Sequence, residues 1–290
     1  MATAIAIQAF NKADSVVRTL ESIVLARGIT DYHLFVRQDG CSGSKETAKY
    51  RMAWMETSQV LASWISRNKD QFASVSFESS DHNNGPYQTA ERLITTALEM
   101  SDSVIFSEDD VIFERDAMEW FERALINPMF LRPNVWAIAG ESRFFDSYRH
   151  VPSGSDVQRA LEVTHTQNLI DRFVYFDFLP SSCFATTRDK WAKFGTTRGT
   201  TRGDRAVTDR CLTEGKACFW PVIARCRDTG MHHPLGYSVR WKGVHHTAFK
   251  NTYICSGMLN SASGDVIELS STQKDALLTE FTRHWELLNA

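Results

Sequence analysis

Residues 103–110 read SVIFSEDD, a short apolar strand that runs directly into three adjacent carboxylates, Glu108, Asp109 and Asp110. Adjacent carboxylates repel one another, and a fold tolerates them where a hard cation or the positive end of a helix offsets their charge. A divalent metal is therefore a natural partner of this acidic triplet. The alternative is that Asp109 or Asp110 caps a following helix while the other acids are solvated.

The sequence before the triplet alternates between strands and helices. Apolar strands are expected at 3–8, 33–37 and 73–77, each followed by a polar loop and then by helical periodicity, at 16–25, 45–65 and 87–100. Asp14 or Ser15 is available as the N-cap of the first helix. This alternation predicts an α/β fold with mostly right-handed crossovers. Such sheets bind ligands at the carboxyl ends of their strands.

The sequence after the triplet is less regular. It predicts a helix at 115–125, strands at 135–139, 161–164, 174–178 and 183–185, and a terminal helix at 273–288. The stretch TTRGTTRGDR, residues 196–205, has no apolar period and predicts a loop. No linker separates independent domains. We therefore expect a single domain over 1–290, with a first half (1–110), a second half (111–250) and a C-terminal extension (251–290).

Composition narrows the function classes. The 290 residues carry 32 basic and 35 acidic side chains, so the formal net charge is −3, which gives no strong nucleic-acid signal. No apolar run approaches the roughly 20 residues of a membrane helix, and the opening MATAIAIQAFNK does not read as a secretion signal. The scattered cysteines form no C-x-x-C pair and indicate reduced, mostly buried thiols. The expected location is cytoplasmic.

Three further polar residues follow the expected strands. Lys12 comes after the first strand, Asp39 after the second and His82 after the third, so all three should open on the same sheet edge as the acidic triplet. Taken singly, each has an ordinary explanation: a solvated lysine, a plain Asp-Gly turn and a satisfied loop histidine. Taken together with a metal, they suit a nucleotide diphosphate.

The sequence resembles the GT-A glycosyltransferases, and most closely the inverting N-acetylglucosaminyltransferase I family. The resemblance is carried by FNKADSVVRTLESI, VRQDG, HNNGPYQTAERLITTAL, VIFSEDDVIFERDAMEWF, VWAIAGES, FDFLPSSCFATTRDKW and GDRAVTDRCLTEGKACFWPVIARCRDTG. It spans roughly residues 4–237. It implies a GT-A fold, that is, a single mixed, mostly parallel sheet flanked by helices.

The resemblance also implies roles at the acidic triplet. Asp110 becomes the ligand of Mn²⁺, or Mg²⁺, which holds the donor's diphosphate. Glu108 and Asp109 become contacts to the sugar nucleotide. The family has an arginine where this chain has Lys12, which keeps the charge for a phosphate contact but loses the bidentate fork.

The resemblance implies roles for residues outside the triplet as well, at the uracil of the donor and at the acceptor. Asp39 matches the aspartate that meets uracil, and His82 matches a histidine near the base. The family's catalytic aspartate aligns with Asp204, although the flanking tryptophans are missing here, and Asp209 is the reserve candidate for general base. Asp204 as a simple helix N-cap is an equal alternative. Residues 228–240 match a mobile loop, and one of His232, His233, His245 or His246 is a candidate further metal ligand.

These observations together predict a metal-dependent inverting glycosyltransferase that moves N-acetylglucosamine or another hexose from a UDP-sugar to a hydroxyl-bearing acceptor, carbohydrate or other. Residues 1–110 would bind the nucleotide and 111–250 the acceptor. Two alternatives stay open. One is a sugar-nucleotide nucleotidyltransferase or hydrolase, which shares the metal site, and the other is a non-catalytic glycan-binding module.

Overall fold

A computed structural model describes residues 2–43, 47–141, 173–176, 182–198, 203–215, 217–221, 224–230 and 233–235. The strand expected at 161–164, the terminal helix expected at 273–288 and the extension 251–290 lie outside these residues. Among the described residues, no helix is both long and apolar enough to cross a membrane. The described cysteines are all buried, and no disulfide links them to one another.

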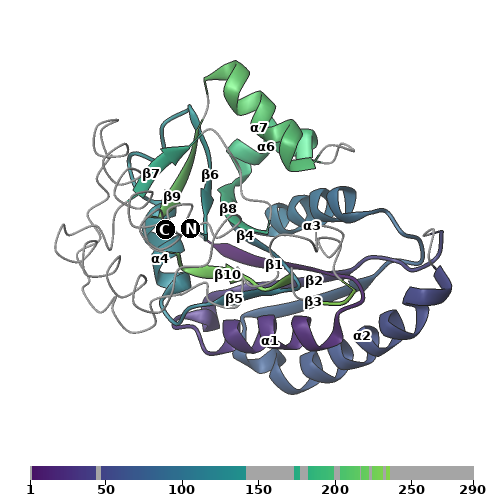
Figure 1. Cartoon of the computed structure of the whole chain (residues 1–290). Coiled ribbons are helices and arrows are strands. Elements are labelled where there is room, and N and C mark those ends of the chain that lie inside the picture. Colours follow the sequence, from purple (N-terminus) through teal and green to yellow (C-terminus); the bar gives the residue numbers. More distant parts are fainter. Residues whose placement is uncertain are drawn as a thin grey trace, which may run out of the picture.

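The first half follows the predicted alternation of strands and helices (Figure 1). Strands β1, β2, β3 and β4 lie parallel in the order β3-β2-β1-β4, and the helices between them are α1, α2 and α3. The bounds are β1 Thr3–Ala9, α1 Ala13–Val24, η1 Ile29–Asp31, β2 His33–Gln38, α2 Thr47–Asn68, η2 Lys69–Gln71, β3 Ser74–Ser79, α3 Pro86–Met100 and β4 Ser103–Glu108.

The second half continues the same sheet with mixed pairing. Strand β8 runs antiparallel to β4, and the full order in the described residues is β3-β2-β1-β4-β8-β6-β9-β7. The bounds are β5 Val111–Phe113, α4 Ala117–Leu125, β6 Val135–Ala139, β7 Phe173–Phe176, β8 Cys183–Thr187, α6 Arg188–Arg198, α7 Gly203–Glu214, β9 Ala217–Pro221 and β10 Cys226–Asp228.

The loop predicted for 196–205 is wrong at both ends, because α6 runs to Arg198 and α7 begins at Gly203. The local sequence is a poor helix former, but these two helices are supported by burial. Trp191 and Phe194 of α6, and Val207 and Cys211 of α7, are buried in the same cluster as residues of α3. Tertiary packing therefore outweighs weak helix propensity here.

Two layers of core cover the two faces of the sheet. Alternate residues of β1 point to opposite faces: Ile5 and Ile7 join the cluster that includes α1 and α4, whereas Ala4 and Ala6 join the cluster built on α3, α6 and α7. Figure 1 shows the corresponding arrangement, with α1 and α2 on one side of the sheet and α3 on the other. This sandwich leaves the strand ends free to carry polar loops.

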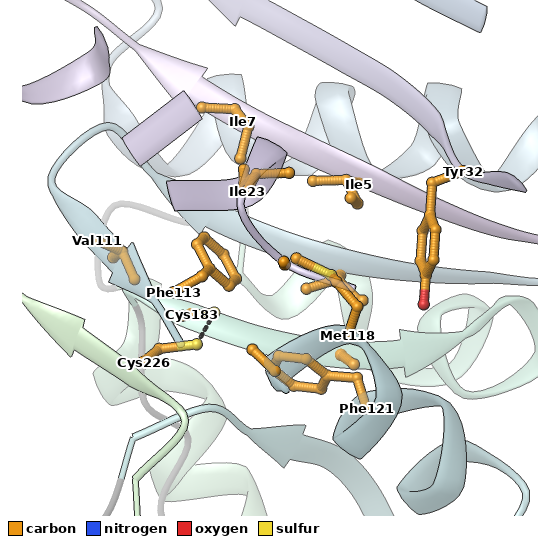
Figure 2. Packing of buried hydrophobic residues seen from close by; sticks show 14 of the residues in the cluster. Ile5, Ile7, Ile23, Tyr32, Val111, Phe113, Met118, Phe121, Cys183 and Cys226 are labelled. Atoms are coloured by element: carbon orange, nitrogen blue, oxygen red, sulfur yellow. Dashed lines mark hydrogen bonds between the residues drawn. The ribbon is translucent and has the colours of Figure 1, made fainter. Parts of the chain in front are cut away.

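A second, small sheet forms where the chain leaves the acidic triplet. Strand β5 pairs antiparallel with β10, and Val111 lies opposite Asp228. Figure 2 shows Val111 and Phe113 of β5 packed near Ile23 of α1, with Cys226 of β10 next to Cys183 of β8; the two sulfur atoms lie 3.6 Å apart. This β5–β10 ribbon brings a late segment of the chain against Asp110.

Candidate functional site

The acidic triplet ends β4 and turns into β5. Glu108 is the last residue of the strand, and Asp109 and Asp110 form the turn before Val111. Both aspartates are buried, at 4% exposure each. The element that follows is a strand, so the alternative in which Asp109 or Asp110 caps a helix is wrong. The helix N-cap in this region is Asp116, ahead of α4.

Lys12 is the cation that faces these two aspartates. Its Nζ lies 2.7 Å from Asp109 Oδ1 and also contacts Asp110 Oδ2. Burial works against the charge of Lys12, but the two carboxylates outweigh burial and raise the lysine pKa. The alternative in which Lys12 is merely solvated is therefore wrong. Lys12 also occupies the N-cap position of α1, where Asp14 or Ser15 was expected, and its side chain makes no cap hydrogen bond.

Asp109 is fixed from two directions. Its Oδ2 accepts a hydrogen bond from the backbone N–H of Phe10 at 3.0 Å, and its Oδ1 faces the Lys12 ammonium. Burial is the largest influence on Asp109 and raises its pKa. The carboxylate is thus held by the loop after β1, which ties the ends of two neighbouring strands together.

Residues 228–230 wrap around Asp110. The backbone N–H and the hydroxyl of Thr229 both donate to the Asp110 carbonyl, at 2.8 and 2.7 Å. Gly230 lies so close that an added Cβ would stand 1.9 Å from Asp110 Oδ2, so a larger residue would have to displace the Asp110 carboxylate. Asp228 Oδ1 accepts a hydrogen bond from the Gly230 N–H at 2.7 Å. Burial, Asp110 and Glu141 raise the pKa of Asp228.

The residues around Asp110 suit a divalent cation. Asp110 Oδ1 is buried and has no hydrogen-bond partner in the described part of the chain. Buried carboxylate oxygens are normally satisfied, and Mg²⁺ or Mn²⁺ binds such oxygens. No group of three His, Cys, Asp or Glu side chains among the described residues is placed to enclose a metal by itself.

Asp39 and His82 lie together, but Asp39 is already occupied. Its Oδ1 accepts from the backbone N–H groups of Gly40 and Asn84, at 3.0 and 2.9 Å, and its Oδ2 accepts from Gly85 at 2.9 Å. Its side chain therefore holds the loop that begins α3. His82 is exposed, and its backbone packs so tightly on Gly40 that a Cβ there would lie 2.3 Å from the His82 carbonyl carbon.

The late histidines are only partly described. His233 Nε2 lies 2.9 Å from Asp14 Oδ1 in the first turn of α1. Asp14 is partly buried, but the contact with His233 lowers its pKa. Thr229 thus lies at Asp110, and His233 lies at the start of α1. His232, His245 and His246 lie outside the described residues, as do residues 231, 232 and 236–240 of the loop expected at 228–240.

The candidate bases lie on α7. The helix begins at Gly203, so Asp204 is in its first turn and is not the residue before the helix. Asp209 is half-buried further along the helix. The assignment of either aspartate as general base stays a prediction. Asp228 was missed from the sequence because its only signal is a three-residue strand, CRD, which shows no usable periodicity.

Comparison with solved structures defines the class of fold. Over 82% of this chain and 59% of that protein, the structure resembles the mannosyltransferase PcManGT from Pyrobaculum calidifontis, solved with GDP-Man and Mn²⁺, at 15% identity and a TM-score of 0.53. The structure is also similar to S. aureus TarS 1-349, solved with UDP-GlcNAc, at 13% identity and a TM-score of 0.49. This similarity covers 98% of this chain and 72% of the TarS chain. No family model and no curated protein matches the sequence.

The chain therefore has the GT-A fold, with a mixed sheet flanked by helices, as the sequence predicted. It spans about three fifths of the length of the mannosyltransferase that it resembles. The narrower resemblance to the N-acetylglucosaminyltransferase I family stays a prediction.

Proposed function

We propose that this protein is a metal-dependent glycosyltransferase that transfers N-acetylglucosamine or another hexose from a UDP-sugar to an acceptor hydroxyl with inversion. The observation that carries the proposal is the cluster at the end of β4, where Asp110 presents a buried, unpartnered oxygen beside Lys12. The GT-A sheet places this cluster at the carboxyl end of its parallel strands, where α/β sheets bind ligands. The similarity to a mannosyltransferase solved with GDP-Man and Mn²⁺ supports the reaction class.

The chemistry divides between two parts of the chain. Departure of a nucleoside diphosphate requires positive charge beside its phosphates, and a divalent cation held by Asp110 supplies Lewis-acid stabilisation there when bound. Lys12 adds a second positive charge at the same place. In-line attack on the anomeric carbon requires one carboxylate to take the proton of the acceptor hydroxyl. Asp204, with Asp209 in reserve, is proposed for that proton.

Thermal unfolding with a panel of UDP-, GDP-, CDP- and dTDP-sugars, each with and without Mn²⁺, tests the donor. A ligand at a hundred times its dissociation constant adds about 2.7 kcal/mol to stability, which raises the melting temperature by several degrees. We expect a Mn²⁺-dependent shift with UDP-sugars. Failure of every nucleotide to shift the folded protein would contradict the proposal and favour a glycan-binding module.

Two sets of variants test the roles. Asp110→Ala should abolish the Mn²⁺-dependent shift, whereas Asp102→Ala, at the opposite end of the same β4 strand, should leave it intact. Asp204→Asn should keep donor binding and lose transfer. If Asp204→Asn transfers sugar at the parental rate, the base is elsewhere and Asp209→Asn becomes the decisive variant.

A further inference from the structure

We propose that Asp228 is a second carboxylate ligand of the divalent cation, paired with Asp110 across the β5–β10 ribbon. This inference rests on the proposed function, because it concerns the cation of the same site. It gives a metal-binding role to a residue that the resemblance placed only at the start of an expected loop, 228–240.

The backbone places Asp228 beside Asp110. The antiparallel pairing of β10 with β5 sets Asp228 opposite Val111, the residue that directly follows Asp110. The two hydrogen bonds from Thr229 to the Asp110 carbonyl lock the next residue of the late segment to the same turn. Both carboxylates are therefore carried on hydrogen-bonded backbone, which suits a preformed metal site.

Each of the two carboxylates uses one oxygen for contacts within the protein. Asp110 is 4% exposed, and its Oδ2 contacts Lys12 while its Oδ1 has no hydrogen-bond partner among the described residues. Asp228 uses its Oδ1 to accept the Gly230 N–H. In the described part of the chain no hydrogen bond or ion pair is directed to Asp228 Oδ2. Each of the two aspartates thus offers one oxygen.

The charge balance points the same way. Lys12 forms ion pairs with Asp109 and Asp110, and the negative charges of Asp110 and Glu141 both act on Asp228. Like charges held together in a buried place repel one another, and a divalent cation removes that repulsion. One ammonium group does not neutralise this set of acids.

The coordination number explains why nucleotide is also required. Mg²⁺ and Mn²⁺ prefer oxygen ligands, and Mg²⁺ is commonly held by one or two protein carboxylates together with substrate phosphates and water. Two aspartates match this arrangement. Mn²⁺ should therefore bind more tightly with UDP than alone.

The test is Mn²⁺ binding to the full chain in the presence of saturating UDP, measured by calorimetry and by electron paramagnetic resonance of free Mn²⁺. Asp228→Asn keeps the acceptor for the Gly230 N–H but loses the charge, and we expect at least a tenfold loss of Mn²⁺ affinity. The matched control is Glu114→Gln, which neutralises a half-buried acid just beyond β5. The backbone N–H of Glu114 donates to the carbonyl of Arg225, just before β10, so the control lies on the same ribbon. Glu114→Gln should bind Mn²⁺ like the parent.

Thermal unfolding without metal separates a ligand from a structural residue. Because Asp228→Asn removes a repelled carboxylate, its metal-free melting temperature should equal or exceed that of the parent. A purely structural role predicts a lower melting temperature with unchanged Mn²⁺ affinity, which would overturn the inference. If the parent binds Mn²⁺ and Asp228→Asn binds it equally well, only this inference is overturned. If the parent binds no Mn²⁺ with any nucleotide, the proposed function is overturned as well.

Discussion

At the scale of single residues, Lys12 is the internal counter-ion of the site. Its side chain is 13% exposed and bridges Asp109 and Asp110. Breaking a buried ion pair by removing one partner leaves uncompensated charge and costs about 3–5 kcal/mol. Lys12→Met should therefore lower the free energy of unfolding in metal-free buffer by about that amount, as measured by denaturant titration.

Lys12→Arg is the control for that change, because it keeps the positive charge and should retain most of the stability. Mn²⁺ without nucleotide should stabilise Lys12→Met by more than it stabilises the parent, since the cation replaces the missing charge beside Asp109 and Asp110. An unfolding free energy of Lys12→Met equal to that of the parent would show that the buried contacts of Lys12 contribute little.

Gly230 is the second residue on which Asp110 depends. Since a Cβ at this position would lie 1.9 Å from Asp110 Oδ2, Gly230→Ala must displace the carboxylate. We expect a tenfold or greater loss of Mn²⁺ affinity in the presence of UDP, measured by calorimetry. Gly195→Ala creates a similar overlap with the Trp191 ring and should reduce stability while leaving Mn²⁺ affinity unchanged. Equal Mn²⁺ affinity in Gly230→Ala and the parent would refute the tight contact.

At the scale of elements, Asp39 joins the end of β2 to the start of α3. Its carboxylate accepts the backbone N–H groups of Gly40, Asn84 and Gly85. Because removal of the acceptor leaves backbone donors unsatisfied, Asp39→Ala should destabilise the protein by about 2–4 kcal/mol. Urea unfolding measures this loss. A stable Asp39→Ala protein that has lost UDP affinity would instead support the uracil contact that the resemblance implies.

The elements also show what could be predicted from the sequence. Strands β1 to β4 and helices α1 to α3 were predicted because their apolar residues repeat over many positions, and the acidic triplet was found because it follows such a strand. Strands β5 and β10 are three residues long and show no period. The proximity of Asp228 to Asp110 depends on their pairing across more than a hundred residues, which local pattern does not encode.

At the scale of the whole molecule, the fold gathers three distant segments at one place. The loop after β1 supplies Lys12, the turn after β4 supplies Asp109 and Asp110, and the segment after β10 supplies Thr229 and Gly230. The parallel sheet brings the first two together, and the β5–β10 ribbon adds the third. Because its acids repel one another, this assembly should be more stable with a bound cation than in the metal-free folded protein.

That balance predicts how stability depends on pH without metal. Burial raises the pKa of Asp109 and of Asp228 above the unfolded value of 3.8, and Asp110 raises both further, although Lys12 works in the opposite direction. Between that value and the raised folded pKa, the folded state binds more protons than the unfolded state, so stability falls as pH rises. In buffer with a metal chelator, the melting temperature should be higher at pH 5 than at pH 7.5.

With saturating Mn²⁺ and UDP the trend should reverse, because a cation binds deprotonated carboxylates and competes with protons. Asp228→Asn provides the internal comparison: it should flatten the chelator curve, since one of the raised acids is gone, and it should weaken the rise that Mn²⁺ produces at pH 7.5. Differential scanning calorimetry at the two pH values measures all of these changes. A metal-free melting temperature that rises from pH 5 to pH 7.5 would mean that the carboxylates around Asp110 are not strained by their own charge.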